Sequence, residues 1–445
     1  MDTGFLPGCS GSRLKRSNQL TPHPTAFALP GARMVSPGQE WSPRGPRREP
    51  VPGRPGGKTR LHVDSGSDES HISTEFPSRR PKYFASSRVI VISSKADLEA
   101  LAERIRKAPW VGLDTEADSL HAYPEKLCLV QIAIPGEELL VDPLADLHLE
   151  PLWEALDHHE ILLHAADYDL RLLFQGHHFR PANIFDTMWA ARLLGESRFG
   201  LNDLLTKYLG ITLEKGSQKA NWGRRPLTER MTDYALNDVR YLKELRDRLE
   251  EGLVGLGRLE WLNQICRRNI EDAAVAERRD QDQVWRTKGH DKLSPLGLAV
   301  LREIWHWREK DALRTGRPPF FVLRHEQLFQ IAEAAAESQS HRGLPLPAYL
   351  TPRRREGLVE AAKRGLAVPE SERPIHHRVR TRRLTRAELN EAEIIRLRRD
   401  AQAKLLNIDP TLIAAKATLF ALARHDEFEW ERLLPWQREL LKPAV

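Results

Sequence analysis

Two acidic residues one position apart are the first candidates for chemistry in this sequence. Asp114 and Glu116 follow the apolar run 110–113, which is typical of a buried strand. Alternate side chains of an extended chain project to the same side, so we expect both carboxylates to face one way. An Asp-x-Glu pair is common, and two acids facing water on an edge strand are the simpler interpretation of this pair alone. The recurrence of placed acids downstream favours chemistry.

Three more residues extend the pattern. Asp169 comes shortly after an apolar strand, where a predicted helix would begin at the same sheet edge. A helix N-cap is the alternative for this acid and for Asp167, and for Asp167 it is the role we expect. Tyr234 and Asp238 are four residues apart, so they share one face of a predicted helix. A phenol would then lie one turn from a carboxylate.

Four carboxylates crowded together predict a divalent-metal site. They repel one another and would take up protons unless cations were bound. Oxygen ligands favour Mg²⁺ or Mn²⁺ over zinc. Two such ions, roughly 3.5–4 Å apart, can generate hydroxide, stabilise a leaving alkoxide and hold a phosphodiester in line. Tyr234 could hydrogen-bond the attacking water.

The elements that must position these residues form an α/β unit, expected over 83–285. Apolar and β-branched runs predict strands first, short strands then alternate with helices, and after about residue 187 the pattern is almost wholly helical. A Pro-Gly turn at 135–136 joins the third and fourth strands, so we expect a β-meander. The first four predicted strands are 88–92, 110–114, 127–134 and 138–142.

The rest of the chain divides by composition. Residues 1–82 hold 12 Pro and 10 Gly without an apolar period, which predicts a disordered tail, or sequence upstream of a later start such as Met34. Apolar residues at helical spacing predict an all-helical unit over 290–370. The basic stretch 371–386 has the composition of a linker. The last block, 387–445, is again helical, and we interpret it as a degenerate second copy of the helical unit.

Composition and charge narrow the function classes. No stretch reaches the roughly 18 apolar residues of a membrane span, and we expect neither membrane insertion nor secretion. The 3 cysteines are far apart and indicate neither a disulfide framework nor a zinc site, so a reducing cytosol fits best. Residues 351–445 carry 20 basic and 14 acidic residues, against 35 and 41 in 83–350. This asymmetry favours a nucleic-acid partner, with solvation of helices as the alternative.

Three segments together resemble the exonuclease motifs of the DEDDy superfamily, and in particular those of ribonuclease D. They are 113–116 (LDTE), 164–170 (HAADYDL) and 234–239 (YALNDV). Supporting pieces lie between them, at 129–133, 141–144, 185–188, 200–204 and 224–227. The resemblance covers about 88–250 as the catalytic domain. Beyond it, 305–312 and 318–323 are similar to an HRDC domain, the helical module of ribonuclease D and some helicases.

The resemblance implies a ribonuclease-H-like α/β exonuclease domain followed by HRDC-type helical domains. It also implies metal-dependent hydrolysis from a 3′ end to nucleoside 5′-monophosphates, on tRNA precursors or other structured RNA, in a cytoplasmic protein that we expect to be a monomer. Tyr234 matches the residue that orients water. The acids that match the ligands of two ions, Mg²⁺ or Mn²⁺, are Asp114, Glu116, Asp169 and Asp238.

One segment departs from the family pattern. The family has Gln-x-Ser-Asp-Trp after a Lys, whereas Ala220 and Asn221 here replace the Ser and the Asp. Because the residues that match the metal site are all present, we expect altered substrate contacts rather than loss of activity. Two alternatives stay open: a 3′–5′ DNA exonuclease, and a non-catalytic nucleic-acid-binding scaffold.

Several residues are candidates for contacts with RNA. Trp222 could stack a base, with packing inside the domain as the alternative, and its neighbours Arg224 and Arg225 could hold phosphates. Gln131 could hydrogen-bond a nucleotide, or could be a satisfied core amide. Phosphate contacts that do not depend on base sequence are also expected at Arg353, Arg354 and Arg355 and along the basic stretch 373–386.

Overall fold

A mixed six-stranded sheet carries the site. The computed structural model describes residues 90–214, 216–275, 283–376 and 383–443, so the predicted tail 1–82 and part of the predicted linker lie outside the described residues. The strand order is β1-β4-β3-β2-β5-β6, with β3 antiparallel to its two neighbours and the other pairs parallel. The strands are β1 (Ile90–Ile92), β2 (Val111–Ala117), β3 (Leu127–Ile134), β4 (Glu137–Val141), β5 (Glu160–Leu163) and β6 (Asn183–Asp186).

The meander β2-β3-β4 is the centre of this sheet. All eight residues of β3 are buried, as expected for a strand that is covered on both faces. Strand β2 runs three residues beyond the predicted end, because its pairing with β3 continues through Glu116 to Ala117. The expected meander and the α/β class are confirmed, and β2 brings both of its acids into the sheet itself.

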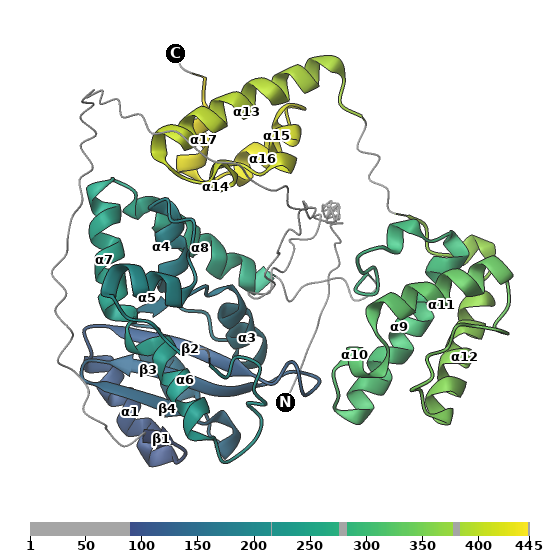
Figure 1. Ribbon diagram of the computed structural model, residues 1–445, viewed down its shortest axis with the longest axis horizontal. Helices are drawn as coiled ribbons and strands as arrows, with labels where there is room; N and C mark the ends of the chain where they lie inside the picture. The colour runs from purple at the N-terminus through teal and green to yellow at the C-terminus, as the bar shows by residue number, and fades with distance from the viewer. Residues whose placement is uncertain (1–89, 215, 276–282, 377–382, 444–445) are drawn as a thin grey trace, which may run out of the picture. The chain divides into compact units, whose positions relative to one another are not determined.

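Helices surround the sheet (Figure 1). Helix α6 contacts β2, β3 and β4, and so brings its own side chains over the middle of the sheet. Ser94 begins α1 by accepting a hydrogen bond from the Asp97 amide at 3.2 Å, which is an N-cap. The helices are α1 (Lys95–Lys107), α2 (Glu150–Leu156), α3 (Asp167–His177), α4 (Thr187–Leu193), α5 (Leu201–Leu209), α6 (Glu229–Arg240), α7 (Leu242–Gly255) and α8 (Leu259–Val275).

The helical unit expected over 290–370 has its own apolar core, built around α9, α11 and α12. Trp285 joins this core from the segment that precedes α9. The helices are α9 (Pro295–Thr315), α10 (Pro319–Val322), α11 (His325–Ser338) and α12 (Pro352–Leu366), with short 3-10 turns at His290–Lys292 (η3) and Glu370–Glu372 (η4). The all-helical class predicted for this unit is confirmed.

The described part of the C-terminal block, 383–443, contains one long helix and four short ones. Its apolar residues share a core with the exonuclease domain, and Trp436 stacks on Trp261 with ring centroids 4.7 Å apart. The helices are α13 (Arg386–Leu406), α14 (Pro410–Ile413), α15 (Lys416–Leu422), α16 (Glu427–Arg432) and α17 (Pro435–Leu441). Its interpretation as a second copy of the first helical unit stays a prediction. In the described part of the chain, no helix has the length and apolar character needed to cross a membrane.

Candidate active site

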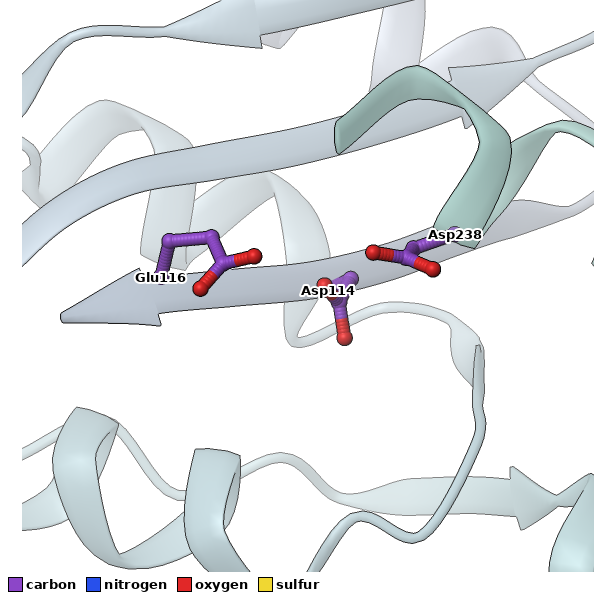
Figure 2. A group of neighbouring side chains, drawn as sticks. All are labelled: Asp114, Glu116 and Asp238. Carbon is purple, nitrogen blue, oxygen red and sulfur yellow. The ribbon is translucent and has the colours of Figure 1, made fainter. Parts of the chain in front are cut away.

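Three of the predicted acids form one cluster. Asp114 and Glu116 project from β2, and Asp238 reaches them from α6 (Figure 2). One carboxylate oxygen of each lies within 4.8 Å of those of the other two. The strand alternation expected from the sequence explains the first pair, and the packing of α6 on the sheet supplies the third member. We call Asp114, Glu116 and Asp238 the acidic cluster.

The acidic cluster is poorly suited to hold three negative charges by itself. Burial, followed by the charges of Asp169, Asp238 and Glu116, raises the pKa of Asp114 well above its usual range. Burial and the charges of Asp238 and Asp169 raise the pKa of Glu116 to about 9. Burial also raises the pKa of Asp238 to about 7, against a lowering by its hydrogen bond with Tyr234. Half-buried carboxylates that resist ionisation for these reasons fit a bound divalent cation, which would supply the missing positive charge.

Asp169 lies beside the acidic cluster rather than within it. It is 6% exposed in the first turn of α3 and accepts a hydrogen bond from the Thr115 hydroxyl. Burial raises its pKa to about 6, against a lowering by the Thr115 hydroxyl. Its charge in turn raises the pKa of Asp114, and its hydrogen-bond donor, Thr115, is the residue that follows Asp114 in β2. The metal-ligand role of Asp169 therefore stays a prediction.

A second buried aspartate, Asp186, holds the turn that leads to Asp169. Its carboxylate accepts hydrogen bonds from the amides of Ala165 at 3.1 Å and Ala166 at 2.9 Å, and it also caps α4. Ala165 has a φ of +60°, so the turn has a backbone shape that needs support. The cap role expected for Asp167 is wrong, because Ala166 is the N-cap of α3 and Asp167 forms an ion pair with Arg171 at 2.6 Å.

Tyr234 lies one turn before Asp238, as its spacing predicts. Burial, and then the charges of Asp238, Glu116 and Asp114, raise the pKa of its phenol, so the hydroxyl keeps its proton and can donate it in a hydrogen bond. The exposed Gly216 lies against the ring: a Cβ there would come within 1.8 Å of Tyr234 Cδ2. Only glycine permits this approach, so the loop before α6 and the tyrosine are fitted to each other.

For Gln131 the sequence left two roles open, a contact with a nucleotide and a satisfied core amide. It pairs with Asp114 across β2 and β3, and directly paired residues project to the same face of a sheet. Its side chain is fully buried, and neither its amide nitrogen nor its oxygen has a hydrogen-bond partner among the described residues. It is therefore neither a satisfied core amide nor an exposed group, and it lies beside a carboxylate of the acidic cluster. Only the strand register could have revealed this.

The structure separates the candidates for RNA contact after α5. Trp222 is 1% exposed, which favours the alternative of an indole packed inside the domain. Arg225 donates to both carboxylate oxygens of Asp142 at 2.6 Å and to the backbone oxygens of Trp222 and Cys128. Both arginines are exposed as whole residues, but the Arg225 guanidinium is used in these internal hydrogen bonds and its side chain is 27% exposed. The RNA contacts stay predictions, and the geometry favours Arg224 among them.

The three arginines at the start of α12 differ in the same way. Arg354 donates to Asp311 at 2.7 Å, and Arg355 donates to the backbone oxygens of Leu350 and Pro347. Arg353 is exposed. It is the member of the three best placed to meet a phosphate from solvent.

Two family models match this chain, and its curated relatives include ribonucleases D. Residues 89–253 match the family described as 3′-5′ exonuclease, and residues 297–341 match the HRDC domain. Ribonuclease D of Desulfotalea psychrophila is 30% identical over 79% of this chain and 96% of its own length. Ribonuclease D of Jannaschia sp. is 31% identical over 75% and 88%. The crystal structure of Escherichia coli RNase D, described as an exoribonuclease involved in structured RNA processing, has a TM-score of 0.64 at 24% identity, covering 81% of this chain and 93% of that one.

Proposed function

This chain belongs to the ribonuclease D family and is a 3′–5′ exoribonuclease, and we propose that it uses divalent metal at the acidic cluster to trim the 3′ ends of structured RNA. The proposal is carried by three half-buried carboxylates from β2 and α6, whose ligand oxygens lie within 4.8 Å of one another. The proposed substrates are tRNA precursors or similar RNAs with a free single-stranded 3′ end. The product would be nucleoside 5′-monophosphates.

The proposed roles follow from where each side chain lies. Asp114, Glu116 and Asp238 would hold Mg²⁺ or Mn²⁺, with Asp169 as a further ligand beside them. Two bound ions would supply positive charge for the attacking water and for the leaving oxygen. Tyr234 keeps its hydroxyl proton and is held by Asp238, so it can orient the water that attacks the phosphodiester.

The test follows RNA that is labelled at its 5′ end and has a structured body and a single-stranded 3′ tail. Wild type is compared with Asp238→Asn and with Asp233→Asn, which makes the same chemical change at an exposed position of α6. With Mg²⁺ or Mn²⁺, wild type and Asp233→Asn should shorten the RNA stepwise from its 3′ end. Asp238→Asn should be slower by about 100-fold or more, and EDTA should stop the reaction.

Three outcomes would contradict the proposal. RNA that is bound but left intact by the metal-loaded wild type would favour the non-catalytic scaffold. Preference for a DNA strand of the same sequence would favour the DNA exonuclease. Trimming at an unchanged rate in EDTA would show that the reaction does not need a metal ion.

A further inference from the structure

A pocket of about 410 Å³ lies in the first helical unit, far along the chain from the acidic cluster. It is lined by the segment that precedes α9, by α9 itself and by the residues that follow η4. Its volume is within the range of pockets that hold small ligands or ligand groups.

The lining is basic. Arg286, Arg302 and Arg373 all contribute to it, together with His306, and none of the described residues that line it is acidic. Arg286 and Arg302 line the same pocket, and burial, followed by the charge of Arg302, lowers the pKa of Arg286. Like charges held together without a carboxylate between them are stabilised by an anion. The pocket therefore favours a negatively charged ligand.

The nearby acid does not cancel this charge. Glu303 lies beside Arg302 on α9, with 3.9 Å between the closest oxygen and Arg302 Nε. Its other carboxylate oxygen accepts a hydrogen bond from Arg364 at 3.0 Å. Glu303 is thus engaged by a second arginine and is not part of the pocket lining.

Other contacts hold the arginines in place. The Arg286 guanidinium lies 4.4 Å from the ring centroid of Trp285, a side chain in the core of the unit, and its Nε donates to Gln283. Arg373 Nε donates to the Val368 backbone oxygen at 3.2 Å. Arg286 Nη1 is buried and has no hydrogen-bond partner within the described chain. A fixed guanidinium with a donor to spare suits the oxygens of a phosphate.

We propose that Arg286, Arg302, His306 and Arg373 form a phosphate site that holds a backbone phosphate of the RNA substrate. This inference rests on the proposed function for the identity of its ligand. The site binds the body of the RNA through charge and does not recognise bases. The 3′ end is trimmed at the acidic cluster. A free phosphate ion offers the same oxygens, so the experiment must separate the two sources.

The experiment measures binding of a tailed RNA hairpin to the full chain by fluorescence anisotropy, in EDTA and at several salt concentrations. The pocket variant is Arg286→Gln/Arg302→Gln/Arg373→Gln. The control, Arg317→Gln/Arg324→Gln/Arg342→Gln, removes the same charge from exposed positions of the same unit. The pocket variant should bind about tenfold more weakly at low salt, and its slope of log Kd against log salt should fall by about 1. The control should change much less.

Further measurements keep the outcome decisive. Thermal unfolding checks that both variants are folded, and Arg302→Gln alone is a milder second variant, since its side chain is 33% exposed. Equal weakening by the pocket and control variants, or wild-type affinity in the pocket variant, would overturn the proposal. So would loss of inorganic phosphate binding with unchanged RNA affinity, because the pocket would then serve the free ion. Because EDTA suppresses turnover, the result stands apart from whether the chain hydrolyses RNA.

Discussion

At the residue scale, the acidic cluster is held against the preference of each carboxyl for its neutral form. The same burial that protects the site raises the pKa values of Asp114, Glu116 and Asp238. Without metal, the folded chain therefore binds protons that the unfolded chain releases. Stability and metal binding become linked to pH through these groups.

Glu116→Gln should flatten the pH dependence of stability in the metal-free protein. The pKa of Glu116 is raised from 4.5 to about 9, so its favourable contribution is present in full below about pH 4.5 and is lost as the pH rises through about 9. In EDTA at pH 8 to 9, the variant should melt a few degrees above wild type, and the difference should shrink toward pH 5. Thermal unfolding across this range measures it. If the curves of Tm against pH ran parallel for the two proteins, the raised pKa of Glu116 would be contradicted.

Added Mg²⁺ provides the control for that experiment. Metal binding requires ionised carboxylates, so Mg²⁺ at pH 8 should raise the Tm of wild type more than that of Glu116→Gln. An equal rise in both proteins would place the stabilising ion somewhere other than the acidic cluster.

Among the elements, the loop before α6 packs closely against α6 at the ring of Tyr234. Gly216 brings the loop backbone against Tyr234, and that helix also carries Asp238. The loop belongs to the segment in which Ala220 and Asn221 depart from the family pattern. A substitution in the loop can therefore change the reaction rate by moving the Tyr234 hydroxyl.

Gly216→Ala should lower kcat by about tenfold, because a methyl group there must displace either the loop or the Tyr234 ring. The matched control is Gly176→Ala on α3, where an added Cβ meets no atom within 4 Å. Steady-state trimming of the tailed RNA measures both. If Gly216 acts through the tyrosine hydroxyl, adding Gly216→Ala to Tyr234→Phe should cause little further loss. Fully additive losses would show that the glycine acts by another route.

Sequence patterns predicted the strands well and the tertiary partners less well. The run 127–134 predicted β3 to the residue, because a strand buried on both faces is a continuous apolar run. The approach of Asp238 to Asp114 required the family motifs, since helix spacing places a residue on a face but does not say what that face meets. Asp186 is placed by the turn that it holds, and Gln131 is placed by the register of β3 against β2. Neither feature can be recognised from neighbouring residues in the sequence.

At the scale of the whole molecule, the C-terminal block is joined to the exonuclease domain by more than apolar packing. Arg258, which is 5% exposed, donates to the backbone oxygens of Leu193 at 2.6 Å and Leu406 at 2.8 Å. These are the last residues of α4 and α13, where helix carbonyls lack partners within the helix. One guanidinium thus caps two helices from distant parts of the chain.

Arg258→Met should reduce the free energy of unfolding by roughly 2–4 kcal/mol, because a buried carbonyl and a part-buried one both lose charged donors. Arg267→Met is the control, since that side chain is 59% exposed and pairs with Glu260 on the surface. Urea unfolding followed by tryptophan fluorescence measures both variants. A loss at Arg258 no larger than that at Arg267 would show that apolar contacts alone hold the block.

The acidic cluster draws its members from β2 and from α6, and these elements are made at different times during synthesis. A nascent chain that has completed β2 carries Asp114 and Glu116 but lacks Asp238, and therefore cannot assemble the cluster. On the proposed mechanism, the enzyme remains inert until α6 has left the ribosome. A chain that ends before α6 is therefore expected not to trim RNA.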